Sequence, residues 1–352
     1  MEKSPLASEL DEMLTVTTLP WEKLRNARIF ITGGTGFWGS WLLESLVYAN
    51  EKLGLRAQAV ILTRNEEVFR KKCPHLADAS GIFFHHGDVR SFRYPEGQFT
   101  HVIHAATEAS DQLNRENPGL MRDVIVSGTR RTLEFAAQSG ARQFLLASSG
   151  AVYGRQRPEI THIEEDDSGL TGPLSLSSAY AEGKREAERL GLAFSSPGLS
   201  LKIARGFAFV GPYLPLDTHF AIGNFIRDAL RETLIVIKGD GTPYRSYLYG
   251  SDLAVWLWTI LLKGKTGRAY NVGSERRVNV GELAQIVAAQ LNPRLEIRIA
   301  QKPVLGQTPE QYVPSTKRAK TELGLRETVS LEEAIVRTAH WAQMTGLSKH
   351  VA

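Results

Sequence analysis

Residues 28–47, RIFITGGTGFWGSWLLESLV, combine a short apolar segment, a glycine-rich turn and a segment whose apolar residues have helical spacing. The turn carries Gly33, Gly36 and Gly39. Glycines allow the backbone to approach a pyrophosphate, and the start of the following helix supplies N–H groups and a partial positive charge. This stretch therefore predicts a strand, a phosphate-binding turn and a helix.

The alternation of apolar strands and helices continues along the chain. We expect strands at 27–32, 57–63, 81–85, 100–105, 142–148 and 200–206. Helical patterns at about 38–50, 117–138 and 179–195 separate several of them. Continuous apolar runs are typical of parallel strands that are covered on both faces. The pattern predicts a doubly wound parallel α/β sheet of the Rossmann type.

The domain organisation is predicted from a change of pattern after residue 207, where shorter elements with more glycine and proline begin. We expect an N-terminal appendage at 1–25, containing a short surface helix, and a dinucleotide-binding domain at 26–207. Residues 208–352 would form mainly a smaller substrate-binding lobe that is interleaved with the first domain. Such a lobe would place a cleft over the carboxyl ends of the sheet.

The glycine turn and a later Tyr-x-x-x-Lys motif carry a family resemblance. Thr32-Gly-Gly-Thr-Gly-Phe-Trp-Gly39 has glycines three and then three residues apart, unlike the classical two-and-three spacing. Tyr180 and Lys184 lie one helical turn apart. The chain resembles the extended branch of the short-chain dehydrogenase/reductase superfamily, which includes the NAD(P)-dependent nucleotide-sugar epimerases and dehydratases. The resemblance extends from about Arg28 to about Arg337.

Three residues carry the chemistry that this resemblance implies. Ser149 has the place of the catalytic hydroxyl, three residues before the valine of Val-Tyr-Gly. Tyr180 would be the acid/base, with its pKa brought from ~10 toward neutrality by Lys184 and a positive nicotinamide ring. Ser149 would hydrogen-bond the same sugar oxygen, and Lys184 would also hold the cofactor ribose.

The predicted cofactor site draws on the glycine turn and on the ends of several strands. It comprises Gly33, Thr35, Gly36, Phe37, Trp38, Gly39, Thr63, Arg64, Asp88, Val89, His104, Ala105, Ala106, Tyr180 and Lys184. By the resemblance, Asp88 holds the adenine, whereas His104 fits a cofactor contact and a core histidine equally. Thr63 stands where NAD users commonly have aspartate, and Arg64 suits a 2′-phosphate, so NADP(H) is favoured over NAD(H). Stacking of Arg64 on adenine is the alternative.

A nucleotide-diphosphate sugar is the substrate that the resemblance implies. Within residues 239–252, GDGTPYRSYLYGSD, Arg245 would pair with the diphosphate, a role that suits its planar charged fork. Asn224 and Ser149 complete the predicted substrate contacts, and a solvated loop arginine is the alternative for Arg245. Ala208 and Ile125 replace asparagines that are common in relatives.

The two residues after Ser149 limit which reactions of the family the chain could catalyse. Dehydratases of the family carry Asp-Glu there and UDP-glucuronate decarboxylases carry Glu, but this chain has Gly150 and Ala151, which cannot transfer a proton. We therefore expect redox chemistry at a sugar carbon, C4, as a 4-ketoreductase or 4-epimerase. Because residues 180–185, YAEGKR, resemble the decarboxylase helix, that reaction remains an alternative. So does a dehydratase-like reaction that uses the acidic run 164–167, which we interpret instead as a solvated loop.

Two further alternatives belong to other functional classes. One is a non-catalytic NADP-binding regulatory protein, against which the intact Ser149, Tyr180 and Lys184 argue. The other is a reductase of a small carbonyl compound without a nucleotide, which the segment around Arg245 disfavours.

Composition limits the partners and the compartment. The 352 residues carry a net charge of +4 with scattered basic residues, so we expect no nucleic-acid partner. Cys73 is the only cysteine, which excludes an intramolecular disulfide and a zinc cluster, and His85-His86 lacks partner ligands for a metal. The longest apolar run, 253–262, is about half of the ~20 residues that a membrane span needs. We expect a cytoplasmic homodimer without a membrane segment.

Overall fold

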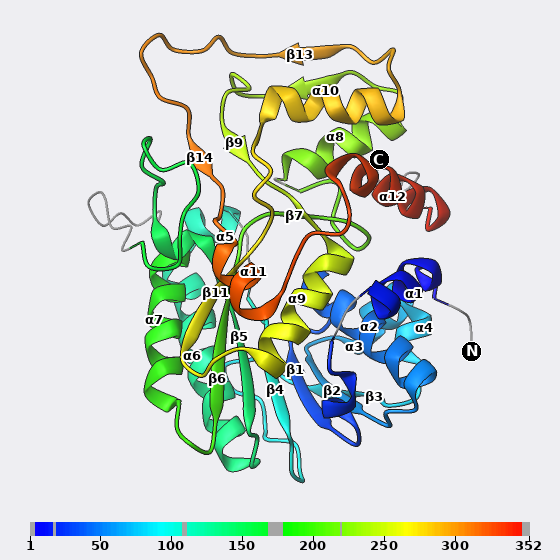
Figure 1. Cartoon of the computed structure of the whole chain (residues 1–352), viewed down its shortest axis with the longest axis vertical. Coiled ribbons are helices and arrows are strands. Elements are labelled where there is room, and N and C mark those ends of the chain that lie inside the picture. The colour runs from blue at the N-terminus through cyan, green and yellow to red at the C-terminus, as the bar shows by residue number, and fades with distance from the viewer. Residues whose placement is uncertain (1–3, 17–18, 108–110, 168–178, 219, 347–352) are drawn as a thin grey trace.

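Seven parallel strands form the central sheet in the computed structural model, which describes residues 4–16, 19–107, 111–167, 179–218 and 220–346. Their order is β11-β6-β5-β4-β1-β2-β3 (Figure 1). Their bounds are β1 (Arg28–Thr32), β2 (Gln58–Thr63), β3 (Ile82–His86), β4 (His101–His104), β5 (Gln143–Ser149), β6 (Ser200–Gly206) and β11 (Arg268–Val272). The predicted doubly wound α/β fold is confirmed. The seventh strand, β11, comes from the C-terminal third and was not predicted.

Helices cover both faces of the sheet. Helices α6 (Pro118–Gln138) and α7 (Ala179–Phe194) pack on one face, and α2 (Phe37–Leu53) and α9 (Gly250–Lys263) pack together on the other (Figure 1). The residues of β1 are apolar on both faces because each face is covered. Ile29 and Ile31 belong to the core under α2 and α9, whereas Phe30 belongs to the core under α6.

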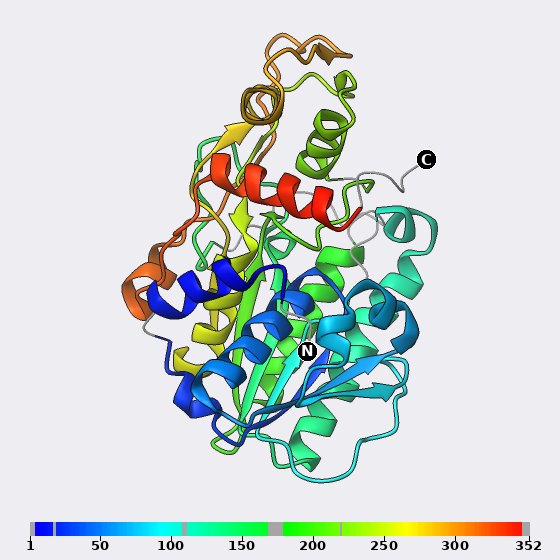
Figure 2. The same cartoon turned by 90° about the vertical axis from the view of Figure 1, so that its right-hand side faces the viewer.

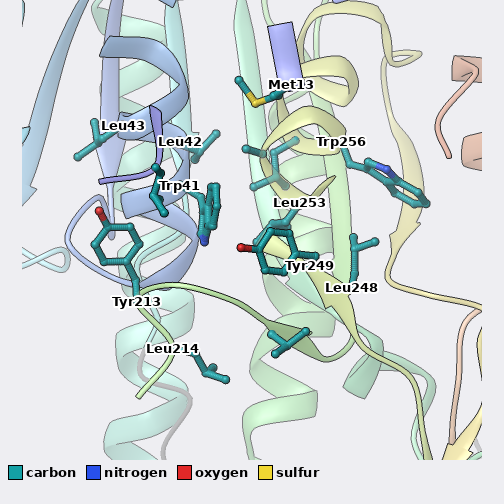
Figure 3. Packing of buried hydrophobic residues seen from close by; sticks show 14 of the residues in the cluster. Met13, Trp41, Leu42, Leu43, Tyr213, Leu214, Leu248, Tyr249, Leu253 and Trp256 are labelled. Atoms are coloured by element: carbon teal, nitrogen blue, oxygen red, sulfur yellow. The ribbon is translucent and has the colours of Figure 1, made fainter. Parts of the chain in front are cut away.

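Aromatic packing fixes the C-terminal part of the chain to the first domain (Figure 3). The rings of Trp41 in α2 and Tyr249 have centroids 5.7 Å apart at 67°, and the Trp41 indole N–H donates to the carbonyl oxygen of Pro212 at 3.1 Å. A Cβ on Gly250, the first residue of α9, would lie 2.1 Å from the Trp41 ring. Glycine is thus required where α9 begins, because the indole occupies the place of a side chain.

The N-terminal segment contributes to the same core. Leu6, Leu10 and Met13 are buried in or beside α1 (Ala7–Val16), a helix that packs on α2 and α9. The Tyr249 hydroxyl donates to the Glu9 carboxylate at 2.7 Å. The helix expected within residues 1–25 is present, and its apolar face extends the main core.

A second group of elements gathers at the upper end of the molecule in Figure 1. Helix α12 (Leu331–Met344) packs on one side against the helices α8 (Ala221–Leu230) and α10 (Val280–Leu291), as Figure 2 shows. It also contacts the short strands β7 (Phe209–Val210) and β10 (Leu248–Tyr249). Small sheets pair β12 (Val278–Asn279), β9 (Tyr244–Arg245) and β14 (Gln311–Tyr312), and also β13 (Ile297–Ile299) and β8 (Ile235–Ile237).

The remaining elements are short connections. They are η1 (Trp21–Leu24), α3 (Glu66–Lys72), α4 (Pro74–Ala77), α5 (Asp111–Glu116), η2 (Gly150–Tyr153) and α11 (Lys317–Leu323). None of the helices among the described residues has the length and apolar character needed to cross a bilayer.

Candidate active site

The glycine turn follows β1 at the point where the strand order reverses, with β2 on one side and β4 on the other. Ligands of open α/β sheets bind at this switch point. Gly33 has φ +72°, and a Cβ there would lie 2.5 Å from the carbonyl carbon of Ala105. The Ala106 N–H donates to the Thr32 hydroxyl at 3.1 Å. The ends of β1 and β4 are therefore in direct backbone contact, which only glycine at position 33 permits.

The start of α2 is open to an anionic group. Gly36 caps the helix without a side-chain hydrogen bond, and a Cβ at Gly39 would lie 2.3 Å from the backbone of Gly34. Two buried hydroxyls near this turn, those of Ser40 and Thr107, have no hydrogen-bond partner among the described residues. Uncapped N–H groups, unpaired buried hydroxyls and a turn too close for side chains together fit a dinucleotide pyrophosphate.

The aromatic residues of the turn, Phe37 and Trp38, lie against Phe209, which follows the end of β6. The Trp38 ring makes an edge contact with Phe209 at 5.4 Å, and a Cβ on Gly206 would lie 2.3 Å from Trp38. Phe37 lies 6.2 Å from the same phenylalanine ring. Thr35, between them and Gly33, is partly exposed. These residues therefore connect the turn to the end of β6.

The predicted adenine end of the cofactor site lies beyond β2. Arg64 is exposed after β2, and the Thr63 hydroxyl accepts a hydrogen bond from the Asn65 N–H at 3.2 Å. The Asp88 carboxylate forms an ion pair with Arg90 at 2.9 Å, which holds the pKa of Asp88 below its usual range. Val89, the next residue in the chain after Asp88, packs against α6 at Gly128.

His104 is bonded through both ring nitrogens. Nδ1 lies 2.8 Å from the Thr32 hydroxyl and Nε2 lies 3.1 Å from the Thr129 hydroxyl, and the side chain is buried. Burial, and then the charge of Lys184, lower the pKa of His104 to about 3, so the ring is neutral. Of the two sequence interpretations, this environment matches the core histidine.

The structure brings the three predicted catalytic residues together at the carboxyl edge of β5. Ser149 ends β5, and Tyr180 and Lys184 lie in the first turns of α7, which packs on β5. The Lys184 ammonium donates to the carbonyl oxygen of Ala147 at 2.8 Å and lies 5.7 Å from the centre of the Tyr180 ring. A hydrogen bond links Ser149 and Tyr180.

Burial dominates the electrostatics of Tyr180 and Lys184. Burial raises the pKa of Tyr180 above its ordinary value, and the hydrogen bond with Ser149 opposes this only in part. The predicted lowering toward neutrality requires a positive nicotinamide ring as well as Lys184, so it stays a prediction for the complex with cofactor. Burial also lowers the pKa of Lys184 to about 8, against the opposing charge of Glu188. Desolvation outweighs the effect of Ser149 at Tyr180 and the charge of Glu188 at Lys184.

A buried polar network that the sequence analysis missed lies beneath these residues. Glu188 follows Lys184 by one helical turn and accepts hydrogen bonds from Ser148 at 2.5 Å and from Arg205 at 2.9 and 2.7 Å. Arg205 also donates to the Tyr153 hydroxyl at 2.8 Å. The spacing of Lys184 and Glu188 was the only sequence signal for this network.

The acidic run 164–167 is not wholly a solvated loop, and that interpretation is wrong for Glu165. This side chain is buried and accepts a hydrogen bond from the Asn271 N–H at 2.9 Å. Burial raises its pKa. Glu164 and Asp166 are exposed, as expected.

Of the predicted substrate residues, Arg245 and Asn224 lie in the second group of elements, whereas Ser149 ends β5. Arg245 in β9 forms an ion pair with Glu310 at 2.8 Å and is partly exposed, so a diphosphate would have to compete with this carboxylate. Asn224 in α8 donates to the carbonyl oxygen of Thr218 at 2.8 Å and accepts from Arg227 at 2.9 Å. Their contact with a substrate remains a prediction.

Metal and thiol chemistry have no visible basis in the described part of the chain. It contains no group of three or more His, Cys, Asp or Glu side chains placed to hold a metal ion. His85 is bonded to the carbonyl oxygen of Arg93 at 2.6 Å. Burial raises the pKa of the Cys73 thiol to about 12.

The glycine turn, the Ser-Tyr-Lys cluster and the sheet between them lie within residues 29–273, which match the model of the "NAD dependent epimerase/dehydratase family". The chain belongs to this family. It is 32% identical over 311 residues to UDP-glucuronic acid decarboxylase 3 of Arabidopsis thaliana, a match that covers 88% of this chain and 87% of the relative. The family's enzymatic character agrees with the intact catalytic cluster.

Solved structures agree in fold. An epimerase from Methanothermobacter thermautotrophicus superposes with a TM-score of 0.78 at 23% identity and covers 99% of each chain. MoeE5, solved in complex with UDP-glucose and NAD, has a TM-score of 0.73 at 25% identity and covers 90% of this chain and 99% of its own. The central sheet and its covering helices are thus those of nucleotide-sugar enzymes of this family.

Proposed function

We propose that this enzyme oxidises or reduces C4 of a nucleotide-diphosphate sugar, as a 4-ketoreductase or 4-epimerase, with NADP(H) as the preferred cofactor. The observation that carries the proposal is the cluster of Ser149, Tyr180 and Lys184 at the same carboxyl edge of the sheet as the glycine turn, without an ionisable side chain at positions 150 and 151. A relative named as a UDP-glucuronic acid decarboxylase and MoeE5, which was solved with UDP-glucose, support the substrate class.

Each residue of the catalytic cluster would have its own role in this reaction. A bound nicotinamide would supply or accept the hydride. Tyr180 would take the proton from the C4 hydroxyl, or return it in the reductive direction, while Ser149 holds the same oxygen. Lys184 would hold the cofactor ribose, and its positive charge would favour the phenolate form of Tyr180.

The preference for NADP(H) rests on Arg64, which is exposed after β2 where a guanidinium could meet a 2′-phosphate. NAD(H) is the alternative, since MoeE5 was solved with NAD. A homodimer and a cytoplasmic location remain predictions.

UDP-glucuronate decarboxylation is the second candidate, because the Arabidopsis relative named for it is 32% identical over most of this chain. For this reaction the chain would lack the glutamate that decarboxylases carry after the catalytic hydroxyl, where it has Gly150 and Ala151. Product masses separate the candidates. We expect a 4-keto nucleotide sugar with NADPH, or a sugar offered for C4 inversion, to react. Release of carbon dioxide from UDP-glucuronate would support the second candidate, and loss of water from dTDP-glucose would contradict both.

A further inference from the structure

A cleft opens at the amino edge of the central sheet, at the opposite edge from the glycine turn and the catalytic cluster. Strands β4, β5 and β6 begin beside it, and the second group of elements lies beyond the other end of these strands (Figure 1). Its volume of about 310 Å³ is near the lower end of the roughly 300–1,000 Å³ that is typical of ligand pockets. The lining residues are Lys23, Thr100, His101, Arg142, Gln143 and Leu262.

Two exposed cations line this cleft. The Lys23 ammonium donates one hydrogen bond, to the carbonyl oxygen of Leu262 at 3.0 Å, and keeps its other N–H groups for a ligand. The Arg142 side chain has neither a hydrogen bond nor an ion pair with the described part of the chain. None of the six described lining residues is acidic. A cleft lined by charges of one sign concentrates the opposite ion, here an anion.

A third cation, Lys202 in β6, lies behind the wall of the cleft. Its side chain is buried, and its ammonium donates to the carboxamide oxygen of Gln143 and to the carbonyl oxygen of Ser200 at 3.3 Å. Burial lowers the pKa of Lys202 to about 8, and the positive charge of Lys23 acts in the same direction. Buried charges in proteins are ordinarily paired. A bound anion would supply the counter-charge that neither lysine receives from the described residues.

His101 offers an unused lone pair to the same cleft, although its side chain is only 7% exposed. The Thr100 hydroxyl donates its one proton to the carbonyl oxygen of Arg28 at 3.1 Å, so the His101 Nδ1–H donates to that hydroxyl at 2.8 Å. Burial and then the charge of Lys202 lower the pKa of His101 to about 4, and the ring is neutral. Nε2 is therefore an acceptor. It has no partner among the described residues and is not enclosed by them, so it faces the cleft that the ring lines.

We propose that this cleft binds a hydrogen phosphate ion. The negative oxygens of the ion match the cations of Lys23, Arg142 and Lys202, and a guanidinium can bind phosphate through two parallel N–H groups. The O–H that hydrogen phosphate keeps at neutral pH is the donor that His101 Nε2 lacks. The inference is independent of the proposed catalytic function, because the cleft lies at the other edge of the sheet.

The lone pair of His101 separates hydrogen phosphate from similar anions. Sulfate has the same tetrahedral shape but carries no O–H at neutral pH. A phosphate monoester has largely lost its O–H there, since its second pKa is about 6. A simple carboxylate has neither the O–H nor a second charge. Inorganic phosphate is therefore the anion that meets both the charge and the hydrogen bonding of the cleft.

Calorimetric titration with inorganic phosphate tests the site, in protein saturated with NADPH so that the glycine turn is occupied. Sodium chloride holds the ionic strength constant. We expect wild type to bind phosphate at least about tenfold more tightly than sulfate, as for loss of one hydrogen bond to a group that is otherwise left unpaired. Absence of phosphate binding, or sulfate binding of equal or higher affinity, would overturn the proposal.

Arg142→Gln tests the location of the ion. Removal of one charged partner should weaken phosphate binding about tenfold or more. Arg294→Gln is the matched control, since it removes an exposed arginine between α10 and β13, and it should leave the phosphate affinity as in wild type. A phosphate affinity of Arg142→Gln within about twofold of wild type would place the ion elsewhere and reject the site.

His101→Phe tests the lone pair, because the new ring has a similar shape but no Nε2. The ratio of phosphate to sulfate affinity should fall toward one, and an unchanged ratio would reject the role of His101. The comparison of the two anions in wild type and the Arg142→Gln titration do not depend on this buried substitution, so they test the proposal even if His101→Phe fails to fold.

Discussion

Glu188 in the catalytic helix α7 and Arg205 in β6 form a largely buried two-bond ion pair, with Nε–Oε1 at 2.9 Å and Nη2–Oε2 at 2.7 Å. The same carboxylate accepts from Ser148, the neighbour of Ser149, at 2.5 Å. Its charge also acts on Lys184, one helical turn away, and raises the pKa that burial lowers to about 8. One carboxylate thus supports the strand end and the lysine together.

Glu188→Gln should destabilise the protein and move its pH dependence. Loss of the charge leaves the largely buried Arg205 without its carboxylate partner, a change that typically costs about 3–5 kcal/mol for a fully buried pair. The pKa of Lys184 should fall further below about 8, so the alkaline limb of activity should move to lower pH. Thermal unfolding and a pH–rate profile measure the two effects.

Glu186→Gln is the control for that variant. It removes a carboxylate from the same helix, but one that pairs with the more exposed Arg122 at 2.5 Å. Its stability should change by at most ~1 kcal/mol. A Glu188→Gln protein with unaltered stability and pH profile would show that the buried pair has neither role.

Tyr180→Phe should abolish turnover and leave cofactor affinity nearly intact, because only the ionisable oxygen is removed. Positioned acid/base groups contribute ~10²–10⁴-fold to rate. Steady-state rates and NADPH titration measure the two properties. Retention of more than about a tenth of the wild-type rate would contradict the acid/base role.

The central fold could be predicted from the sequence because the buried strands are continuous apolar runs. The glycine turn that begins at Gly33 could be predicted because it lies between an apolar strand and a helix. Strand β11 was missed because RAYNV carries Arg268 and Asn271 at an edge of the sheet. The Asn271 side chain is satisfied only by distant segments, as in the hydrogen bond from its Nδ2 to the Ser315 carbonyl oxygen at 3.1 Å.

Sequence reasoning missed Glu165 and Tyr312 for the same reason, because distant segments of the chain determine where these side chains lie. Glu165 belongs to an acidic run that looks solvated, and its burial depends on Asn271 and on the charge of Arg318. Tyr312 has no motif around it, and its place beside Gly150 arises from the pairing of β14 with β9. By contrast, Ser149, Tyr180 and Lys184 were predictable because their spacing is local or fixed by one strand and one helix.

Lys184→Met should change how stability depends on pH. The folded pKa of Lys184, about 8, lies below its ordinary 10.5, so between these values the unfolded chain holds a proton that the folded protein has lost. Stability of the wild type relative to the variant should therefore rise through this window, by roughly 3 kcal/mol in total. Below about pH 8 folded Lys184 is protonated, and the full cost of burying its charge is present.

Urea unfolding of both proteins at a series of pH values measures this difference. Lys317→Met, which replaces an exposed lysine, is the control and should give a curve parallel to the wild type. A Lys184→Met curve that is also parallel to the wild type would mean that the buried amine titrates as it does in the unfolded chain.

Arg64→Ala should weaken NADP binding much more than NAD binding. The exposed guanidinium after β2 would lose a charged hydrogen bond to the 2′-phosphate, worth ~1.5–3 kcal/mol, or about ten- to more than a hundredfold in affinity. Arg294→Ala, which removes an exposed arginine between α10 and β13, controls for the change in net charge and should leave both affinities as they are. Calorimetric titration with each cofactor at one salt concentration measures the effect. Equal losses for NADP and NAD would assign Arg64 to adenine stacking and remove the basis for the preference.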